Sequence, residues 1–170
     1  DFVLRMCAEN SSFLKEGYQH LLLECIRRFG KETPEPEKRE QPPEVSSTGR
    51  LGYEYYNKLG YVPCDVKIHE NAARTLEYAY DDWCIYQLAK ELKRPKKEIA
   101  LFAKRAMNYK NLFDSESKLM RGKQKDGKFA PEFSPLKWGG DFTEGNSWHY
   151  SWSVFHDPQG LILILTEKCF

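Results

Sequence analysis

The sequence lacks three features that would each point to a class of protein. Its 26 basic and 25 acidic residues leave a net charge of +1, so no surplus charge favours nucleic acid or an anionic membrane as a partner. The longest aliphatic run, Leu161 to Leu165, is far shorter than the roughly 20 apolar residues of a membrane helix. No basic stretch followed by an apolar one comes after Asp1. A secretory signal is therefore not visible, and we expect that it was removed or that the chain is a piece.

Cysteine chemistry is not indicated either. The five cysteines are odd in number and widely spaced, and they form no C-x-x-C pair of the kind that binds zinc or acts as a redox dithiol. We interpret them as small residues without a chemical role. No internal repeat is visible. The cysteines are Cys7, Cys25, Cys64, Cys84 and Cys169.

Aromatic residues are abundant. The chain has 170 residues, 41% of them hydrophobic, which suits a single domain with a sizeable core. Ten Tyr, ten Phe and four Trp make up 14% of the sequence, more than a core of this size usually needs. Aromatic rings crowded near polar groups are typical of sugar-binding sites, and the alternative is a core built from large residues.

The chain divides near residue 48. Apolar patches at Phe2 to Met6 and Phe13 to Phe29 predict one or two helices in the first thirty residues. The stretch from Lys31 to Thr48 carries four of the nine prolines among polar residues, which predicts a linker. We therefore expect residues 1–48 to be a helical segment with a proline-rich linker, and residues 49–170 to form the ordered body.

Two antiparallel helices are predicted in the middle of the chain. A broad apolar face begins after Asn71, and a second periodic run follows the connection at Lys93 to Pro95. So short a connection implies an αα-hairpin. The apolar positions are Leu76, Ala79, Tyr80, Trp83, Leu88 and Leu92 in the first helix, and Ile99, Phe102, Ala103, Ala106 and Phe113 in the second.

A long structured loop is expected from Asp114 to Gly145, where helical periodicity is lost and glycine and proline accumulate. Asp126-Gly127 has the composition of a hairpin turn. Trp148, Trp152 and Phe155 then return to helical spacing. Asp157 followed by Pro158 is typical of a helix start, which predicts a last helix to about Leu165. These elements predict a mainly α fold with one long loop and a small β-hairpin.

Potential chemistry is concentrated between Trp138 and Asp157. Indole rings and glycine-rich backbone around Glu144 favour the protonated form of a carboxylic acid, which glycosidases use to protonate a departing oxygen. The alternative is that Glu144 caps the following helix and the tryptophans are core residues. Asp141, Glu144 and His149 also offer metal-ligand chemistry, although their spacing matches no specific motif.

Other polar residues are interpreted more simply. Asp81 and Asp82 are adjacent, so on a helix they point about 100° apart and cannot face one substrate. We expect one to be solvated and the other to pair locally. His20 and His69 have no visible partners and are interpreted as structural or surface residues.

Several ordered blocks of this sequence resemble the α-mannosidases of glycoside hydrolase family 92. The resemblance covers roughly Thr48 to Leu165, about two thirds of the chain. The blocks that carry it are Gly52 to Tyr56, Leu59 to Pro63, Leu76 to Ile85, Asn108 to Asp114, Met120 to Lys123, Thr143 to Trp148 and His156 to Leu161.

The resemblance implies a catalytic domain of the (α/α)₆ toroid type. It implies calcium-dependent, inverting removal of terminal α-linked mannose from N-glycans by an enzyme that is usually exported. The family's general acid is the glutamate of the Thr-Glu-Gly-Asn motif, which falls on Glu144. Asn146, Trp148 and His149 belong to the same motif and are expected to shape the substrate pocket. The expected partners are mannose-containing glycans, with no nucleic acid and no membrane.

The chain also departs from the family. An inverting hydrolase needs a second carboxylate about 6.5 to 9.5 Å from the acid. The family's base and calcium ligands lie downstream of the segment that contains His156, beyond this chain, and its amino-terminal β-sandwich domain has no counterpart here. We therefore expect part of a toroid that carries the acid without its partner and is inactive alone. The alternative is a non-catalytic helical module that binds carbohydrate or protein.

Overall fold

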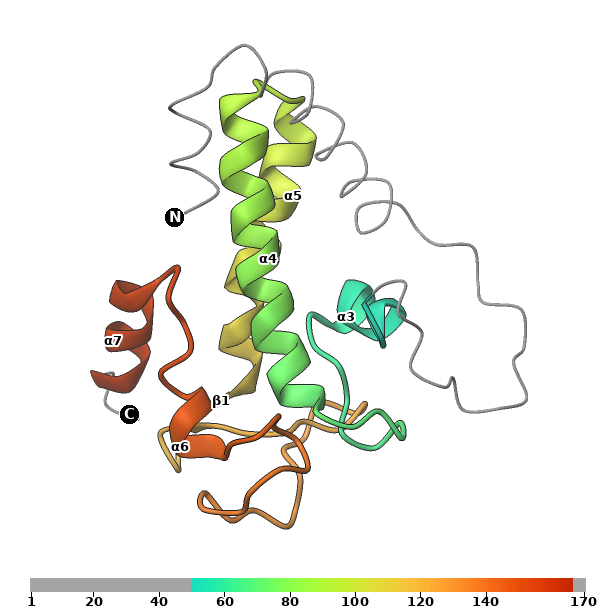
Figure 1. Cartoon of the computed structure of the whole chain (residues 1–170), viewed down its shortest axis with the longest axis vertical. Coiled ribbons are helices and arrows are strands. Elements are labelled where there is room, and N and C mark those ends of the chain that lie inside the picture. The colour runs from blue at the N-terminus through green and yellow to red at the C-terminus, as the bar shows by residue number, and fades with distance from the viewer. Residues whose placement is uncertain (1–49, 167–170) are drawn as a thin grey trace, which may run out of the picture.

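The computed structural model describes residues 50–166, so the predicted helices and linker before residue 49 lie outside the described residues. Helices dominate the described part, and Figure 1 shows them around one long central helix, α4. No helix within residues 50–166 is both long and apolar enough to cross a membrane. The elements are α3 (Tyr53–Leu59), α4 (Asn71–Glu91), α5 (Lys96–Ala106), the 3₁₀ helix η1 (Met107–Leu112), β1 (Phe113–Asp114), β2 (Leu119–Met120), α6 (Ser147–Tyr150) and α7 (Pro158–Thr166).

The αα-hairpin of α4 and α5 is confirmed, and the two helices lie side by side (Figure 1). Lys93 adopts a left-handed backbone with φ 50°, and the amide of Arg94 donates to the carbonyl of Ala89 at 2.9 Å. This bond closes the end of α4 in the manner of a Schellman motif. Pro95 is the residue before α5, a position that needs no amide donor.

The second predicted helix is wrong beyond Ala106, where the chain tightens into η1. Residues three apart lie on the same face of a 3₁₀ helix. Tyr109 and Leu112 are both fully buried, so the tighter winding brings both into the core. Phe113, which was placed on the helical stripe, begins β1 instead.

The long loop contains two tight turns. β1 and β2 form an antiparallel pair that the sequence analysis did not predict. The predicted turn at Asp126-Gly127 is present: Lys123 and Phe129 form an isolated antiparallel bridge, and Gly127 has φ 90°. Two further bonds connect the arms of this turn, since the amide of Gln124 donates to the carbonyl of Lys128 at 2.7 Å and the amide of Ala130 donates to that of Gly122 at 2.9 Å.

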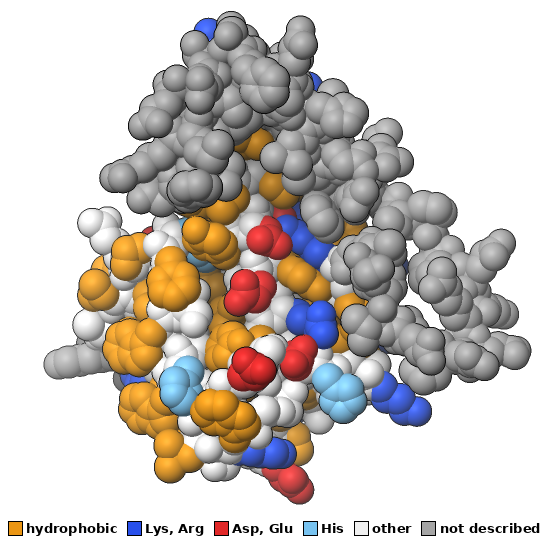
Figure 2. All heavy atoms as spheres, in the orientation of Figure 1, with side chains coloured by type: hydrophobic (Ala, Val, Ile, Leu, Met, Phe, Trp, Pro, Cys, Tyr) orange, Lys and Arg blue, Asp and Glu red, His pale blue; other side chains and the backbone are white. Residues whose placement is uncertain are grey.

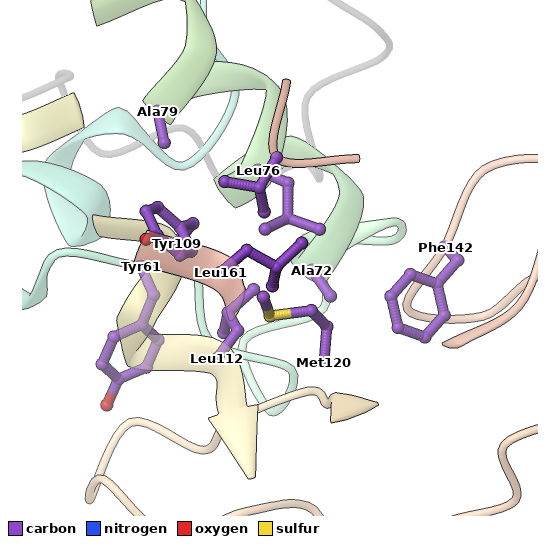
Figure 3. Close-up of a cluster of buried hydrophobic side chains, with 10 residues drawn as sticks. Tyr61, Ala72, Leu76, Ala79, Tyr109, Leu112, Met120, Phe142 and Leu161 are labelled. Carbon is purple, nitrogen blue, oxygen red and sulfur yellow. The ribbon is translucent and has the colours of Figure 1, made fainter. Parts of the chain in front are cut away.

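The loop contributes to the main hydrophobic core. Figure 3 shows Phe142 and Met120 from the loop region facing Leu76 and Ala72 of α4 and Leu161 of α7. Burial of side chains at this density, about 1.5–3 kcal/mol for each large residue, fixes the loop on α4. The ten buried residues of this cluster are Tyr61, Ala72, Leu76, Ala79, Tyr109, Leu112, Met120, Phe142, Val154 and Leu161.

The amino-terminal end of α4 is capped by the loop. Its first residues receive no side-chain cap from Glu70. The backbone carbonyl of Asp141 instead accepts from the amides of Ala72 and Ala73 at 3.0 and 3.1 Å. These bonds satisfy two of the donors that a helix start leaves open. The segment just before Glu144 is therefore anchored to α4, the longest helix within residues 50–166.

The start of α7 is as predicted. The Asp157 carboxylate accepts from the amide of Gly160 at 2.9 Å and from the hydroxyl of Tyr109 at 2.8 Å, so one cap joins α7 to η1. Within the described residues α7 runs from Pro158 to Thr166, which includes the predicted end at about Leu165. The helical interpretation of Trp152 and Phe155 is wrong, because α6 ends at Tyr150 and no helix follows until Pro158.

We predict that Gly160→Ala destabilises the chain by about 1–3 kcal/mol, the usual range for overpacking. A Cβ at this position would lie 2.6 Å from the Tyr109 hydroxyl and would collide with the Asp157 carboxylate. Alanine normally favours a helix over glycine, so a loss of stability would reveal the collision. Chemical denaturation measures it, with the exposed neighbour Gln159→Ala as the control; equal stability of the two variants would contradict the prediction.

Candidate active site

Glu144 lies on a turn between the long loop and α6. Four residues close to Glu144 in the sequence are buried, namely Phe142, Gly145, Asn146 and Ser147. Glu144 itself is exposed and has φ 47°, in the left-handed region that non-glycine residues rarely adopt. Such a backbone costs about 1–3 kcal/mol and persists only where the surroundings impose it.

Hydrogen bonds hold both sides of this turn. The hydroxyl of Tyr150 donates to the carbonyl of Thr143 at 2.9 Å. The amide of Gly139 donates to the carbonyl of Gly145 at 2.8 Å. Glu144 thus stands between two residues whose carbonyls are both bonded to other parts of the chain, which explains why its unusual backbone is maintained.

A capping box fixes the residues after Glu144. The side-chain oxygen of Asn146 accepts from the amide of His149 at 3.2 Å, and the amide of Asn146 donates to Nδ1 of His149 at 3.3 Å. The two bonds satisfy donors at the start of α6 reciprocally. The buried Asn146 therefore positions the turn, while the exposed His149 holds it from outside.

Serine hydroxyls join α6 to the β-hairpin. Ser147 Oγ donates to the carbonyl of Met120, and Ser151 Oγ accepts from the amide of Met120 at 2.8 Å. Both serines are buried. The turn at Glu144 is consequently fixed to β2 as well as to the loop.

The exposed side of the turn carries indole rings. The Trp138 ring meets the His149 ring edge to face, with centroids 5.7 Å apart, and Trp148 is 48% exposed. Figure 2 shows hydrophobic side chains gathered on the side of the molecule where α6 and α7 lie. The large exposed ones in this part of the chain are Leu136, Trp138, Trp148, Trp152, Phe155, Ile162 and Leu163.

Both parts of the structural alternative for Glu144 are wrong. Asn146, not Glu144, caps α6. The tryptophans are not core residues, since Trp138 and Trp152 are 65% and 60% exposed. The expected enclosure of Glu144 by indoles is also absent among residues 50–166, because these rings face outward. The Glu144 side chain forms no hydrogen bond or ion pair with a described residue.

The predicted metal set does not form. Asp141 accepts from the side-chain amide of Asn71 at 2.8 Å and packs against Gly122, while Nδ1 of His149 is used by the capping box. No group of three or more His, Cys, Asp or Glu side chains in the described part of the chain could hold a metal ion.

Asp82 is the centre of a buried charge cluster that the sequence analysis missed. Its carboxylate is fully buried and lies 2.7 Å from Nη1 of Arg50 and 2.8 Å from Nε of Arg105. The Tyr56 hydroxyl donates to it at 3.1 Å. Burial, followed by the Asp82 charge, raises the pKa of Tyr56, so Tyr56 remains a neutral donor.

The interpretation of the aspartate pair is half right. Asp81 is 54% exposed, as expected of the solvated member, although it also contacts Nη2 of Arg50 at 3.3 Å. Asp82 pairs, but with residues 32 and 23 positions away rather than locally. Arg50 lies just before α3 and Tyr56 lies within it, so the cluster connects this helix to the α4–α5 hairpin.

His156 lies in an aromatic cluster outside the Glu144 turn. Its ring centroid is 5.9 Å from that of Tyr80, 6.3 Å from that of Trp83 and 5.6 Å from that of Tyr109. Nε2 is 2.8 Å from the carbonyl of Ala106, so the neutral ring carries its proton there. Burial lowers the pKa of His156 below 6.5, against opposing effects of the Ala106 carbonyl and Asp157.

We predict that His156 makes the chain less stable in mild acid. The unfolded chain takes up this proton near the ordinary pKa of 6.5 and the folded chain only at lower pH. Protons therefore favour unfolding as the pH falls below that value. Unfolding free energies measured from about pH 8 to about pH 5, a range that brackets the ordinary pKa of histidine, should decline less in His156→Gln, which keeps a donor for Ala106. Parallel pH profiles would contradict this.

A carboxylic acid presented beside exposed indole rings on a rigid turn is typical of sites that bind or cleave carbohydrate. The chain belongs to glycoside hydrolase family 92: the glycosyl hydrolase family 92 catalytic domain matches residues 13–168. This confirms the resemblance, and the match begins well before Thr48, where the sequence analysis placed its start.

Solved structures of the family have the same fold. The family GH92 inverting mannosidase of Bacteroides thetaiotaomicron is 40% identical, with a TM-score of 0.74, over 86% of this chain and 18% of that protein. Another family GH92 α-mannosidase of this bacterium is 42% identical, with a TM-score of 0.64, over 67% of this chain and 15% of that one. Its complex with mannoimidazole gives a TM-score of 0.66 at 38% identity, over 72% and 17% of the two chains.

A curated relative is similar as well. An uncharacterized secreted glycosidase of Arthroderma benhamiae is 30% identical over 109 residues, which is 58% of this chain and 14% of that protein. The chain thus spans less than a fifth of the length of each of these relatives. The described residues provide one αα-hairpin, α4–α5, of the helical fold that the family shares.

Proposed function

We propose that this chain is the acid-bearing segment of an exo-α-mannosidase, with Glu144 as the general acid. The observation that carries the proposal is the turn itself. Glu144 is exposed and left-handed, with φ 47°, between Thr143 and Gly145, whose carbonyls both accept hydrogen bonds. Backbone strain of this kind is often retained where it positions a functional side chain, and here it falls on an exposed carboxylic acid.

Glu144 would deliver its proton to the glycosidic oxygen as the bond to the anomeric carbon breaks. The departing sugar then leaves as an alcohol instead of an alkoxide. In an inverting reaction, a second carboxylate activates water on the opposite face of the mannose ring. We infer that this base comes from a part of the whole enzyme that the chain does not span, since the chain covers 18% of the inverting mannosidase.

The residues next to Glu144 would have different roles. Asn146 is buried and occupied by the capping box, so it would position the turn without touching the sugar. Trp148 is half exposed and offers an apolar ring against which a mannose face can pack. His149 is exposed and offers a polar group. Of these three residues, Trp148 and His149 are thus placed to contact substrate.

Terminal α-linked mannose of N-glycans is the substrate class we propose. We also propose that the whole enzyme is exported from the cell. The names of the solved relatives as mannosidases support the sugar, and the secreted relative supports the location. We also propose calcium dependence, with ligands outside residues 50–166. When bound, calcium would help to orient mannose hydroxyls and distort the ring.

The proposal is tested by assaying the whole enzyme, in which this chain is the acid-bearing segment, for release of mannose from α-mannosides with calcium and with a chelator. We expect release with calcium and its loss with the chelator. Release of another sugar, or release of mannose that the chelator leaves unchanged, would contradict the substrate or the metal respectively.

A non-catalytic carbohydrate-binding module is the second candidate. The outward-facing rings of Trp138 and Trp152 favour it, because stacking needs no carboxylic acid. In this case the chain would bind mannosides, and replacement of Glu144 would leave both binding and any hydrolysis unchanged. Binding without hydrolysis by the whole enzyme would support the module.

A further inference from the structure

His149 occupies an unusual position in its capping box. The third helical residue of such a box is normally Glu or Gln, whose side chain reaches back to the amide of the N-cap residue. Here a ring nitrogen performs this task, since the Asn146 amide donates to Nδ1 of His149 at 3.3 Å. The neutral imidazole, unlike a carboxylate, has an N–H donor left over.

The box determines which nitrogen carries the proton. Because Nδ1 accepts a hydrogen bond, it carries no proton, and the neutral ring must hold its proton on Nε2. No described residue accepts a hydrogen bond from Nε2, and His149 is exposed. The ring therefore presents one N–H donor to whatever lies against this surface.

A second contact restricts the ring. Trp138 meets it at 83° with centroids 5.7 Å apart, and the residue after Trp138, Gly139, is bonded through its amide to the carbonyl of Gly145. Gly145 follows Glu144 directly. The indole, the acid and the imidazole donor are thus held around the same turn, on its exposed side.

We propose that the capping box holds His149 as a fixed Nε2–H donor that binds a hydroxyl oxygen of the mannoside whose glycosidic bond lies at Glu144. The proposal rests on the proposed function. Sugar sites combine an apolar ring with a few placed polar groups, and a neutral N–H donor suits a hydroxyl oxygen. His149 would contribute to binding and to the choice of sugar, not to proton transfer.

Three variants separate the donor from the cap. His149→Gln keeps an acceptor for Asn146 and keeps N–H donors. His149→Glu keeps the acceptor but has no donor, and His149→Ala has neither. The glutamate and alanine variants differ from each other in charge and in capping ability. The property that they share is the loss of the N–H donor. Calorimetric titration of the whole enzyme with methyl α-mannoside measures binding, and thermal unfolding measures the cap.

We expect the enzyme with His149→Gln to bind methyl α-mannoside nearly as well as the enzyme that retains His149. His149→Glu and His149→Ala should bind about tenfold more weakly, the effect of one hydrogen bond of ordinary strength. Only His149→Ala should unfold at a lower temperature. Binding by His149→Glu and His149→Ala at unchanged affinity would overturn the donor role.

The ¹⁵N chemical shifts of the imidazole test the proton position without any sugar. A proton on Nε2 is expected, and a proton on Nδ1 in the neutral ring would overturn the inference while leaving the proposed function intact. Absence of methyl α-mannoside binding by the whole enzyme would overturn the proposed function, and the sugar contact of His149 with it. The two failures are thus distinguishable.

Discussion

Glu144→Gln is expected to lower kcat of the whole enzyme for α-linked mannosides of poor leaving groups by about 10²–10⁴-fold, the usual contribution of a positioned acid. Glutamine preserves the size of the side chain and its hydrogen-bonding capacity but cannot release a proton. The folded structure should be unaffected, because Glu144 is exposed and forms no hydrogen bond or ion pair with a described residue. Unfolding of the chain should change by no more than about 0.5 kcal/mol.

The leaving group distinguishes an acid from a residue that only positions substrate. The departing sugar of a disaccharide is a poor leaving group unless its oxygen is protonated, whereas a dinitrophenolate leaves readily without a proton. Glu144→Gln should therefore lose most of its activity on a disaccharide and far less on dinitrophenyl α-mannoside. Asp81→Asn, at a surface carboxylate, serves as the control. Equal loss on both substrates would show that Glu144 is not the acid.

Asp82→Ala is expected to destabilise the chain by about 3–5 kcal/mol, the usual result of removing one partner from a buried ion cluster. The substitution leaves the guanidinium groups of Arg50 and Arg105, whose side chains are 3% and 6% exposed, without the carboxylate they share. It also removes the acceptor for the Tyr56 hydroxyl. The measurement is chemical denaturation followed by circular dichroism.

The adjacent aspartate provides a matched control for Asp82. Asp81→Ala removes a half-exposed carboxylate with one contact to Arg50, so its effect should stay within about 1 kcal/mol. Asp82→Asn, which retains the side-chain shape, keeps the comparison measurable if the alanine variant does not fold. Equal effects of substitution at the two positions would contradict the role of Asp82 as the centre of the cluster.

The parts of the fold that depend on local pattern could be predicted from the sequence. The α4–α5 hairpin followed from apolar periodicity and a short connection, and the start of α7 followed from Asp157-Pro158. The short α3 was not predicted, because seven residues give too little periodicity. Its limits depend on Gly52 and Gly60, which adopt left-handed backbones with φ 79° and 81°.

Tertiary contacts determined what could not be predicted. Trp148, Trp152 and Phe155 have helical spacing, yet α6 stops at Tyr150. The next amides, of Trp152 and Ser153, bond three residues back to His149 and Tyr150, and the side chain of Ser151 accepts from the amide of Met120. Asp82 lies at helical spacing from the buried Ala79, which was a signal of burial. Its arginine partners come from distant segments, and no local rule connects them.

The candidate site could likewise be predicted only in part from the sequence. The motif at Glu144 could be identified in the sequence, and the resemblance gave the acid. The strained backbone of Glu144 and the bonds from Tyr150 and Gly139 that hold its neighbours required the structure. The capping role of His149 was hidden, because the third position of a capping box is usually Glu or Gln.

The central claim is that the turn around Glu144 is the mannoside site of this chain. A titration with methyl α-mannoside, followed residue by residue through backbone amide shifts in NMR spectra, tests it most directly. The account predicts saturable shifts concentrated between Trp138 and His149, with none at the Asp82 cluster. Shifts confined to another surface, or no shifts at saturating sugar, would contradict it.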